Sequence, residues 1–254
     1  ITIRDLEEDQ QGQIWVGTYG NGLYRFDGQH WAHWNAENSP LGNRIRALLV
    51  DRTGRLWVGS NNGLGVWDGQ RWSAYTDADG LETNDVIALV EDDNGHIWIN
   101  YNYLFNGNIS RFDGATFTHY NSEKDGTINR NFISSFKDRD GQLWFGTWVS
   151  SFGGLSRWDG ERFHTLSSED GLTTVAVPSI YQDARGTLYF GTWGGGINLY
   201  DGLVMQTLNQ HDGLVNDMVQ DIIEDRDGYM WITTEGGVTR YKPSEVAPKI
   251  DLSI

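Results

Sequence analysis

The stretch Asp138–Thr147, DRDGQLWFGT in one-letter code, decides the fold because variants of it recur along the whole chain. Its central pattern is Gly, any residue, an apolar residue and then Trp or Tyr, which we call the anchor. Consecutive anchors are separated by 42, 41, 46, 45 and 42 residues, a regular period of one supersecondary unit. The six anchors are Trp15, Trp57, Trp98, Trp144, Tyr189 and Trp231.

Turn signals surround each anchor at fixed distances. An Asp lies six residues and a Gly three residues before every anchor, and an Asp-Gly pair follows most of them, as at Asp27-Gly28. Asp accepts backbone N–H bonds within a turn and Gly adopts positive φ, so both patterns indicate hairpins. Each repeat therefore predicts four strands, a to d; in the second repeat, strand a covers residues 45–50 and strand b residues 55–60.

The repeat predicts an all-β chain, a β-propeller of four-stranded antiparallel blades with almost no helix, since no apolar pattern of period 3.6 is sustained. We expect six blades; a seven-bladed ring or a fragment of a larger assembly is the alternative. We expect residues 1–254 to form one domain, with the last strand of the sixth blade supplied by residues 249–254. The repeats cover approximately residues 1–44, 45–85, 86–131, 132–176, 177–217 and 218–254.

Composition limits the possible partners. The chain has 35 acidic and 19 basic residues, a formal net charge of −16. We therefore expect no nucleic-acid binding, which depends on Lys and Arg contacts to phosphate. The chain has no Cys, and no apolar stretch is long enough to span a membrane. No signal segment is visible, so any targeting segment would lie outside these residues.

Several conspicuous residues have structural explanations. The anchor aromatics are expected to fill the space to the next blade, and the Asp residues before them to support turns rather than bind Ca²⁺. The histidines show no zinc-site spacing, and no catalytic elbow or phosphate loop is present. We therefore expect no cofactor, no catalytic constellation and no enzyme.

Function is expected where the repeats vary, in the b–c loops and d–a links, which share one rim of the blades. Repeats three and four carry aromatic insertions there. Aromatic rings beside amide groups suit a sugar, because its apolar face packs on a ring and its hydroxyls need polar partners. The candidate ligand-binding residues on this rim are Tyr19, Asn61, Tyr101, Tyr103, Trp148, Trp193 and Glu235.

The innermost strands offer a second set of candidates near the channel mouth. Arg44 and Arg130 are added to the ligand-binding candidates for this reason. Asp5 and Asp221 occupy equivalent positions in the first and sixth repeats and would become neighbours if these blades met. They are weak candidates for a cation site, with a solvated channel wall as the alternative.

The chain resembles the two-component regulator propeller repeat family, found in sensor regions of bacterial hybrid two-component systems. The resemblance rests on residues 138–147 and on Gly154–Gly160, GLSRWDG, and it covers nearly the whole chain; the third repeat departs from it at Trp98–Tyr101. It implies a periplasmic or extracellular sensor of carbohydrates or other small ligands. Residues 246–254 resemble the lead-in to the β-sandwich domain that follows such propellers, which is therefore a possible partner.

Two other functions stay open. A protein partner could use the same rim, which would then be flat and aromatic. An enzyme related to the streptogramin lyases is the other alternative, since Trp231–Glu235 faintly resembles their repeat, and of the histidines only His211 lies in a loop that could face a ligand.

Overall fold

The computed structural model describes residues 1–102, 109–127, 131–148 and 153–243. Six antiparallel sheets follow one another along these residues, one for each repeat, and helix is almost absent. This confirms the predicted all-β propeller of six blades. The chain divides into two compact units, residues 1–121 and 122–254, with three sheets in each.

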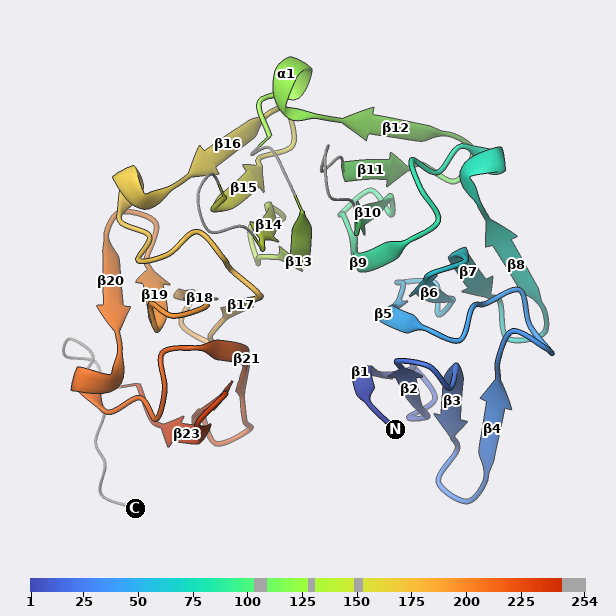
Figure 1. Ribbon diagram of the computed structural model, residues 1–254, viewed down its shortest axis with the longest axis horizontal. Coiled ribbons are helices and arrows are strands. Elements are labelled where there is room, and N and C mark those ends of the chain that lie inside the picture. The colour runs from blue at the N-terminus through green and yellow to red at the C-terminus, as the bar shows by residue number, and fades with distance from the viewer. Residues whose placement is uncertain (103–108, 128–130, 149–152, 244–254) are drawn as a thin grey trace. The chain divides into compact units, whose positions relative to one another are not determined.

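The first unit contains three four-stranded sheets whose strands pair in sequence order (Figure 1). As predicted for the second repeat, strand a runs over Ile45–Val50. The strands are β1 (Ile3–Glu8), β2 (Ile14–Thr18), β3 (Leu23–Phe26) and β4 (Trp31–Trp34); β5 (Ile45–Val50), β6 (Leu56–Ser60), β7 (Gly63–Trp67) and β8 (Trp72–Tyr75); β9 (Val86–Glu91), β10 (Ile97–Tyr101), β11 (Ile109–Phe112) and β12 (Phe117–Tyr120).

The second unit repeats this plan, and the described part of its last sheet has three strands. The strands are β13 (Phe132–Lys137), β14 (Leu143–Thr147), β15 (Leu155–Trp158) and β16 (Phe163–Leu166); β17 (Ser179–Gln182), β18 (Leu188–Gly191), β19 (Ile197–Tyr200) and β20 (Met205–Leu208); β21 (Val219–Glu224), β22 (Met230–Thr234) and β23 (Gly237–Tyr241). The expected contribution of residues 249–254 to the sixth sheet lies outside the described residues.

The helical segments are single turns in the links between sheets. The described residues contain three 3-10 turns, η1 (Asp77–Asp79), η2 (Ser168–Asp170) and η3 (Gln210–Asp212), and one α-helical turn, α1 (Ser122–Asp125). Each 3-10 turn starts with a capping box and ends on a glycine with positive φ. The links are therefore short, hydrogen-bonded connections rather than loose loops.

Within each unit the first strands of successive sheets lie side by side, β1, β5 and β9 in one and β13, β17 and β21 in the other (Figure 1). Four anchors fill the space to the next sheet, as predicted: Trp15, Trp57, Trp144 and Tyr189. Trp57 packs with its ring centroid 6.0 Å from that of Phe112 in the next sheet, and Trp144 lies 5.3 Å from Phe190. Trp231 differs from the other anchors, because 38% of its surface is exposed.

The anchor and the Asp six residues before it form one hydrogen-bonded unit in all six sheets. In the second sheet, Asp51 Oδ1 accepts bonds from the backbone N–H groups of Thr53 and Arg55, at 2.9 and 3.0 Å. Its Oδ2 accepts the indole N–H of Trp57 at 2.8 Å. The sequence assigned this Asp to the turn alone; the bond to the anchor explains why both residues recur at one spacing.

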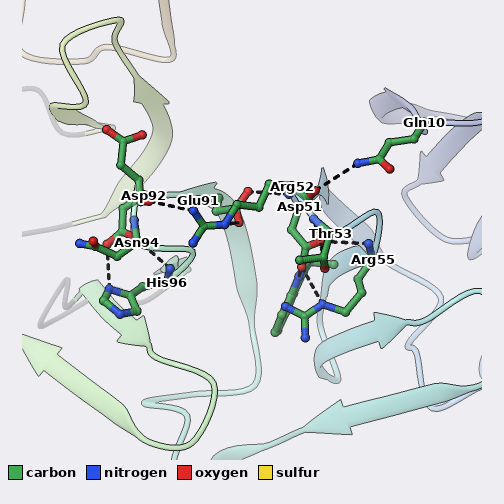
Figure 2. A network of polar contacts seen from close by, with 11 residues as sticks. Gln10, Asp51, Arg52, Thr53, Arg55, Glu91, Asp92, Asn94 and His96 are labelled. Carbon is green, nitrogen blue, oxygen red and sulfur yellow. Dashed lines mark hydrogen bonds and ion pairs between the residues drawn. The ribbon is translucent and has the colours of Figure 1, made fainter.

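Hydrogen bonds at these turns also join neighbouring sheets (Figure 2). The backbone N–H of Arg52 donates to Glu91 Oε2 at 2.8 Å, and its guanidinium donates to the carbonyl of Asp93 at 2.8 Å. Arg139 occupies the same position in the second unit and bonds Gln182 and the carbonyl of Ala184, at 2.9 and 2.7 Å. The a–b turns thus join consecutive sheets as well as consecutive strands.

Candidate functional site

Each sheet has two different ends. Because consecutive strands are antiparallel, the a–b and c–d turns leave at one end, which we call the turn end. The b–c loops and d–a links leave at the other, which we call the loop end. The candidate ligand-binding residues of the sequence belong to the loop end, and the structure shows how their backbone is held.

A buried hydroxyl closes each b–c loop where the repeat has Gly-Thr or an equivalent. Thr18 Oγ1 donates to the carbonyl of Gly22 at 2.7 Å, and Thr192 Oγ1 donates to that of Gly196 at 2.7 Å. Ser60, Thr147 and Thr234 make the corresponding bond. These loops are therefore fixed at their base, so a side chain four residues past the anchor starts from a rigid position.

The d–a links hold the same loops from the other side. The carbonyl of Asn43 accepts the N–H groups of Gly20 and Gly22, at 2.8 and 2.9 Å. The carbonyl of Asp217 accepts those of Gly194 and Gly196, both at 3.0 Å. The residues that precede Arg44 and Met218 thus support the b–c loops, and the side chains of Arg44 and Met218 are exposed.

The second unit presents an exposed aromatic pair at its loop end. The ring centroids of Trp148 and Trp193 are 5.0 Å apart at an interplanar angle of 56°. Trp148 is 43% exposed, and Trp193 is half-buried. Their backbones are bridged to Ala176 and Met218, respectively, in the strand-a regions of the following sheets. The structure thus brings together two predicted residues that are 45 positions apart in sequence.

The first unit presents a different combination around Tyr19, which is 38% exposed. The guanidinium carbon of Arg44 lies 5.1 Å from the centroid of the Tyr19 ring, and the two backbones form a bridge. Asn61 accepts the backbone N–H of Arg44 with its Oδ1 at 3.1 Å. Three of the predicted residues therefore meet here as well.

Tyr101 needs correction as a surface residue. It is 1% exposed and packs in the apolar cluster between the second and third sheets, and burial raises the pKa of its phenol to about 12. It occupies the position that holds Thr or Ser in the other repeats, so the third sheet has a larger buried side chain there. A ligand on the surface cannot reach Tyr101, and we leave it out of the site.

Three predicted residues remain, Glu235, Tyr103 and Arg130. Glu235 is exposed at the loop end of the sixth sheet, where its N–H donates to the carbonyl of Met218 at 3.1 Å. Tyr103 and Arg130 lie outside the described residues.

Asp5 and Asp221 are each engaged within their own unit. Asp5 accepts the backbone N–H of Leu48 at 2.7 Å and that of Leu6 at 2.8 Å. Asp221 accepts Ser179 Oγ at 3.1 Å and the N–H of Ile222 at 2.8 Å. These bonds tie neighbouring inner strands together. No group of three or more His, Asp or Glu side chains suited to a metal occurs in the described part of the chain.

A hollow of about 370 Å³ lies at the turn end, between the first two sheets, where the sequence placed only structural turns. Its lining includes Asp9, Gln13 and Asp68. Asp9 and Asp68 accept the backbone N–H groups of their own turns. We regard this hollow as part of the frame, because its carboxylates already have partners within the protein.

Several proteins of known structure have a similar fold. The extracellular domain of a hybrid two component system from B. thetaiotaomicron shares 20% identity, with a TM-score of 0.62 over 96% of this chain and 39% of that one. PorZ, a surface component of the type-IX secretion system of Porphyromonas gingivalis, shares 18% identity, with a TM-score of 0.72 over 96% of this chain and 38% of that one. This chain thus spans about two fifths of either relative.

The virginiamycin B lyase of Staphylococcus aureus, in a catalytically inactive form with quinupristin, is also similar. It shares 14% identity, with a TM-score of 0.71 over 94% of this chain and 79% of that one. Identities this low show a common fold. A search of curated proteins gave no match. Among the described residues, no helix has the length and apolar character needed to cross a membrane.

The sequence profile described as "Two component regulator propeller" matches six segments, one for each repeat. These are residues 1–20, 39–62, 80–103, 126–149, 171–194 and 213–236, more than half of the chain. The chain therefore belongs to the two component regulator propeller family.

Proposed function

We propose that the chain is a non-catalytic sensor propeller that binds a carbohydrate or other small ligand at its loop ends. The observation that carries this proposal is the exposed pair of Trp148 and Trp193. The apolar face of a sugar ring packs on an indole, and two tilted indoles offer an edge and a face to it.

The backbone around this pair supports binding because it is fixed before a ligand arrives. Trp148 N–H donates to the carbonyl of Asn131 at 2.9 Å, and Trp193 N–H donates to that of Ala176 at 3.0 Å. A preorganised site loses less conformational entropy on binding than a loop that must first become ordered. The indoles are therefore available without a rearrangement of the main chain.

The family and the neighbours named as extracellular domains of two component systems support a sensor role and a location in the periplasm or outside the cell. In such a protein the bound state would be passed to a following domain, for which a β-sandwich after residue 254 is our proposal. The oligosaccharide ligand and this downstream domain are the two partners we expect.

An enzyme of the lyase type is a second candidate, because of the similar fold of the virginiamycin B lyase. The histidine that the sequence singled out for this role, His211, lies in η3, where its Nδ1 is 3.1 Å from Asn209 Oδ1. A protein-binding platform would use the same two indoles. Incubation with quinupristin, with its conversion followed by mass spectrometry, would test the enzyme, and co-purification with the following domain would test the platform.

The test of the proposed function is a thermal-shift screen with a panel of neutral oligosaccharides. A ligand at 100 times its dissociation constant should add about 2.7 kcal/mol of stability to the folded protein. Trp148→Ala should abolish that shift, whereas Trp31→Ala should preserve it, since Trp31 is exposed on β4, an outer strand of the first unit. A shift that survives Trp148→Ala would place the sugar elsewhere, and a panel without shifts would favour the protein partner.

A further inference from the structure

Three arginines surround one exposed tyrosine in the first unit. The guanidinium carbons of Arg4, Arg44 and Arg46 lie 5.0, 5.1 and 5.7 Å from the centroid of the Tyr19 ring. The chain has only 19 basic residues against 35 acidic ones, so three cations at one ring are a marked local reversal of charge. We refer to these four residues as the arginine cluster.

The propeller repeat itself does not require these cations. Arg4 and Arg46 occupy the irregular position of the inner strand, where the pairing register shifts in β1 and β5. The same shift occurs in the third, fourth and sixth sheets, where the residues at this position are Ile87, Ile133 and Gln220. A position that folds equally well with isoleucine does not need arginine for its backbone, which points to a role in contact with something else.

Only one of the three cations is neutralised by an acid. Arg46 Nε lies 3.2 Å from Asp85 Oδ1. Arg4 and Arg44 are exposed, and in the described part of the chain neither forms an ion pair with a carboxylate. Asp5, the acid next to Arg4, accepts backbone N–H bonds from Leu6 and Leu48. The cluster thus keeps an excess of positive charge at the surface.

The donors of the cluster suit an oxyanion. A guanidinium has five N–H donors in a planar fork, and stacking on a ring uses its face rather than those donors. Asn61, whose Oδ1 accepts the backbone N–H of Arg44, also carries an amide NH₂ group that can donate. Arginine forks match carboxylate, sulfate and phosphate groups, which accept two parallel hydrogen bonds.

We propose that Arg4 and Arg44, gathered around Tyr19, form a binding site for the oxyanion group of an acidic ligand. The chemistry shared by a carboxylate, a sulfate ester and a phosphate ester fits the cluster, and a sugar bearing one of them would also engage the Tyr19 hydroxyl and the Asn61 amide. The residues of this site belong to the first unit, whereas the indole pair belongs to the second.

Isothermal titration calorimetry at low ionic strength tests this inference with four probes on one sugar skeleton. These are glucuronate, glucose 6-sulfate, glucose 6-phosphate and, as the neutral reference, glucose. We expect at least one of the three anions to bind and glucose to bind more weakly than that anion. The anion that binds best identifies the source of the oxyanion.

Variants show whether the anion binds at the cluster. Arg4→Gln and Arg44→Gln should each weaken anion binding about ten-fold, a change of about 1.4 kcal/mol. The matched control is Arg71→Gln, an exposed arginine of the same unit at a c–d turn, paired with Asp68, which should leave the affinity unchanged. Failure of all three anions to bind, or binding unaffected by both cluster variants, would overturn the inference. Neutral sugars that depend on Trp148 test the proposed function separately, so either result can fail alone.

Discussion

At the scale of single residues, the Asp side chains before the anchors accept hydrogen bonds both from their turn and from the anchor. Asp51 supports its turn through the N–H groups of Thr53 and Arg55 and also accepts the indole N–H of Trp57. Burial raises the pKa of Asp51, but hydrogen bonds from Trp57, Thr53 and Arg55 outweigh it, so the pKa is lowered from 3.8. The carboxylate is therefore held in its ionised form by the residues that it organises.

Removal of an anchor should be among the most damaging single changes. Trp57 is 2% exposed and fills the space between the second and third sheets. Trp57→Ala should lower the free energy of unfolding by roughly 3–5 kcal/mol, because it leaves a cavity in the core. Urea denaturation measures this, with Trp31→Ala as the exposed control. A change near zero for Trp57→Ala would contradict the assigned packing.

The two kinds of turn aspartate should differ in their effect on stability. Asp51→Ala leaves the buried Trp57 indole without an acceptor and should cost roughly 2–4 kcal/mol, a lost charged hydrogen bond plus an unsatisfied donor. Asp68→Ala removes the bonds of an exposed c–d turn, including the pair with Arg71, and should cost clearly less than Asp51→Ala. Equal losses in chemical denaturation would show that the bond to the anchor contributes little.

At the scale of elements, the b–c loops depend on glycine at the start of strand c. Gly196 has φ of +74°, and a Cβ there would lie 2.2 Å from the carbonyl oxygen of Leu208. Gly202 has φ of +96° with no atom within 4 Å of its Cβ position. The first glycine is required by space and by conformation, and the second by conformation alone.

This difference gives a matched pair of substitutions. Gly202→Ala should cost roughly 1–2 kcal/mol, the penalty of a left-handed conformation for an L-residue. Gly196→Ala should cost clearly more, and it should also weaken ligand binding because it displaces the loop that carries Trp193. Thermal unfolding and the oligosaccharide screen measure the two effects. Comparable stability for both variants would mean that the loop can move away from Leu208 at no cost.

At the scale of the whole molecule, the pH dependence of stability should form a broad plateau. The pKa of Asp92 is lowered from 3.8, since hydrogen bonds from Trp98 and His96 outweigh the raising effect of burial, and that of Asp51 is lowered likewise. A carboxyl group whose pKa is lower in the folded protein than in the unfolded chain stabilises the folded state at pH values above its pKa in the unfolded chain. This contribution should be lost as the pH falls below 3.8.

The alkaline limit has the opposite sign. Burial raises the pKa of Tyr101 and of Tyr189 from 10.0 to about 12. Because these pKa values are raised in the folded protein, the free energy of unfolding should keep its full value below pH 10. It should fall as the pH rises from 10 to 12, because the two phenols ionise at a lower pH in the unfolded chain than in the folded protein. Urea denaturation across pH 3 to 11, with phenolate absorbance followed in parallel, measures both limits. If all 11 tyrosines ionise near pH 10 in the folded protein, the burial of these two phenols is contradicted.

Much of the site could be predicted because the repeat aligns equivalent positions. Tyr19, Asn61, Trp148 and Trp193 each lie four residues past an anchor, and all four lie at loop ends in the structure. Tyr101 was chosen instead as part of the aromatic insertion of the third repeat, although it lies three residues past its anchor, at the position of the buried Thr147. The hydroxyls at the base of the loops, such as that of Thr192, belong to a Gly-Thr pair that recurs in the repeat. The pair indicates the repeat, but the hydrogen bond of its hydroxyl across the loop is visible only in the structure.

The sequence by itself determined the period, the strand order and the division into turn ends and loop ends, since turn chemistry is local. Only the tertiary structure decided which side chains meet across sheets: the indoles of Trp148 and Trp193, and the arginines around Tyr19. Arg4 and Arg44 are 40 residues apart, and nothing in their local sequence marks them as a pair. They gather at one ring because β1 and β5 pack side by side, which brings Arg4 of β1 and Arg44, just before β5, to Tyr19.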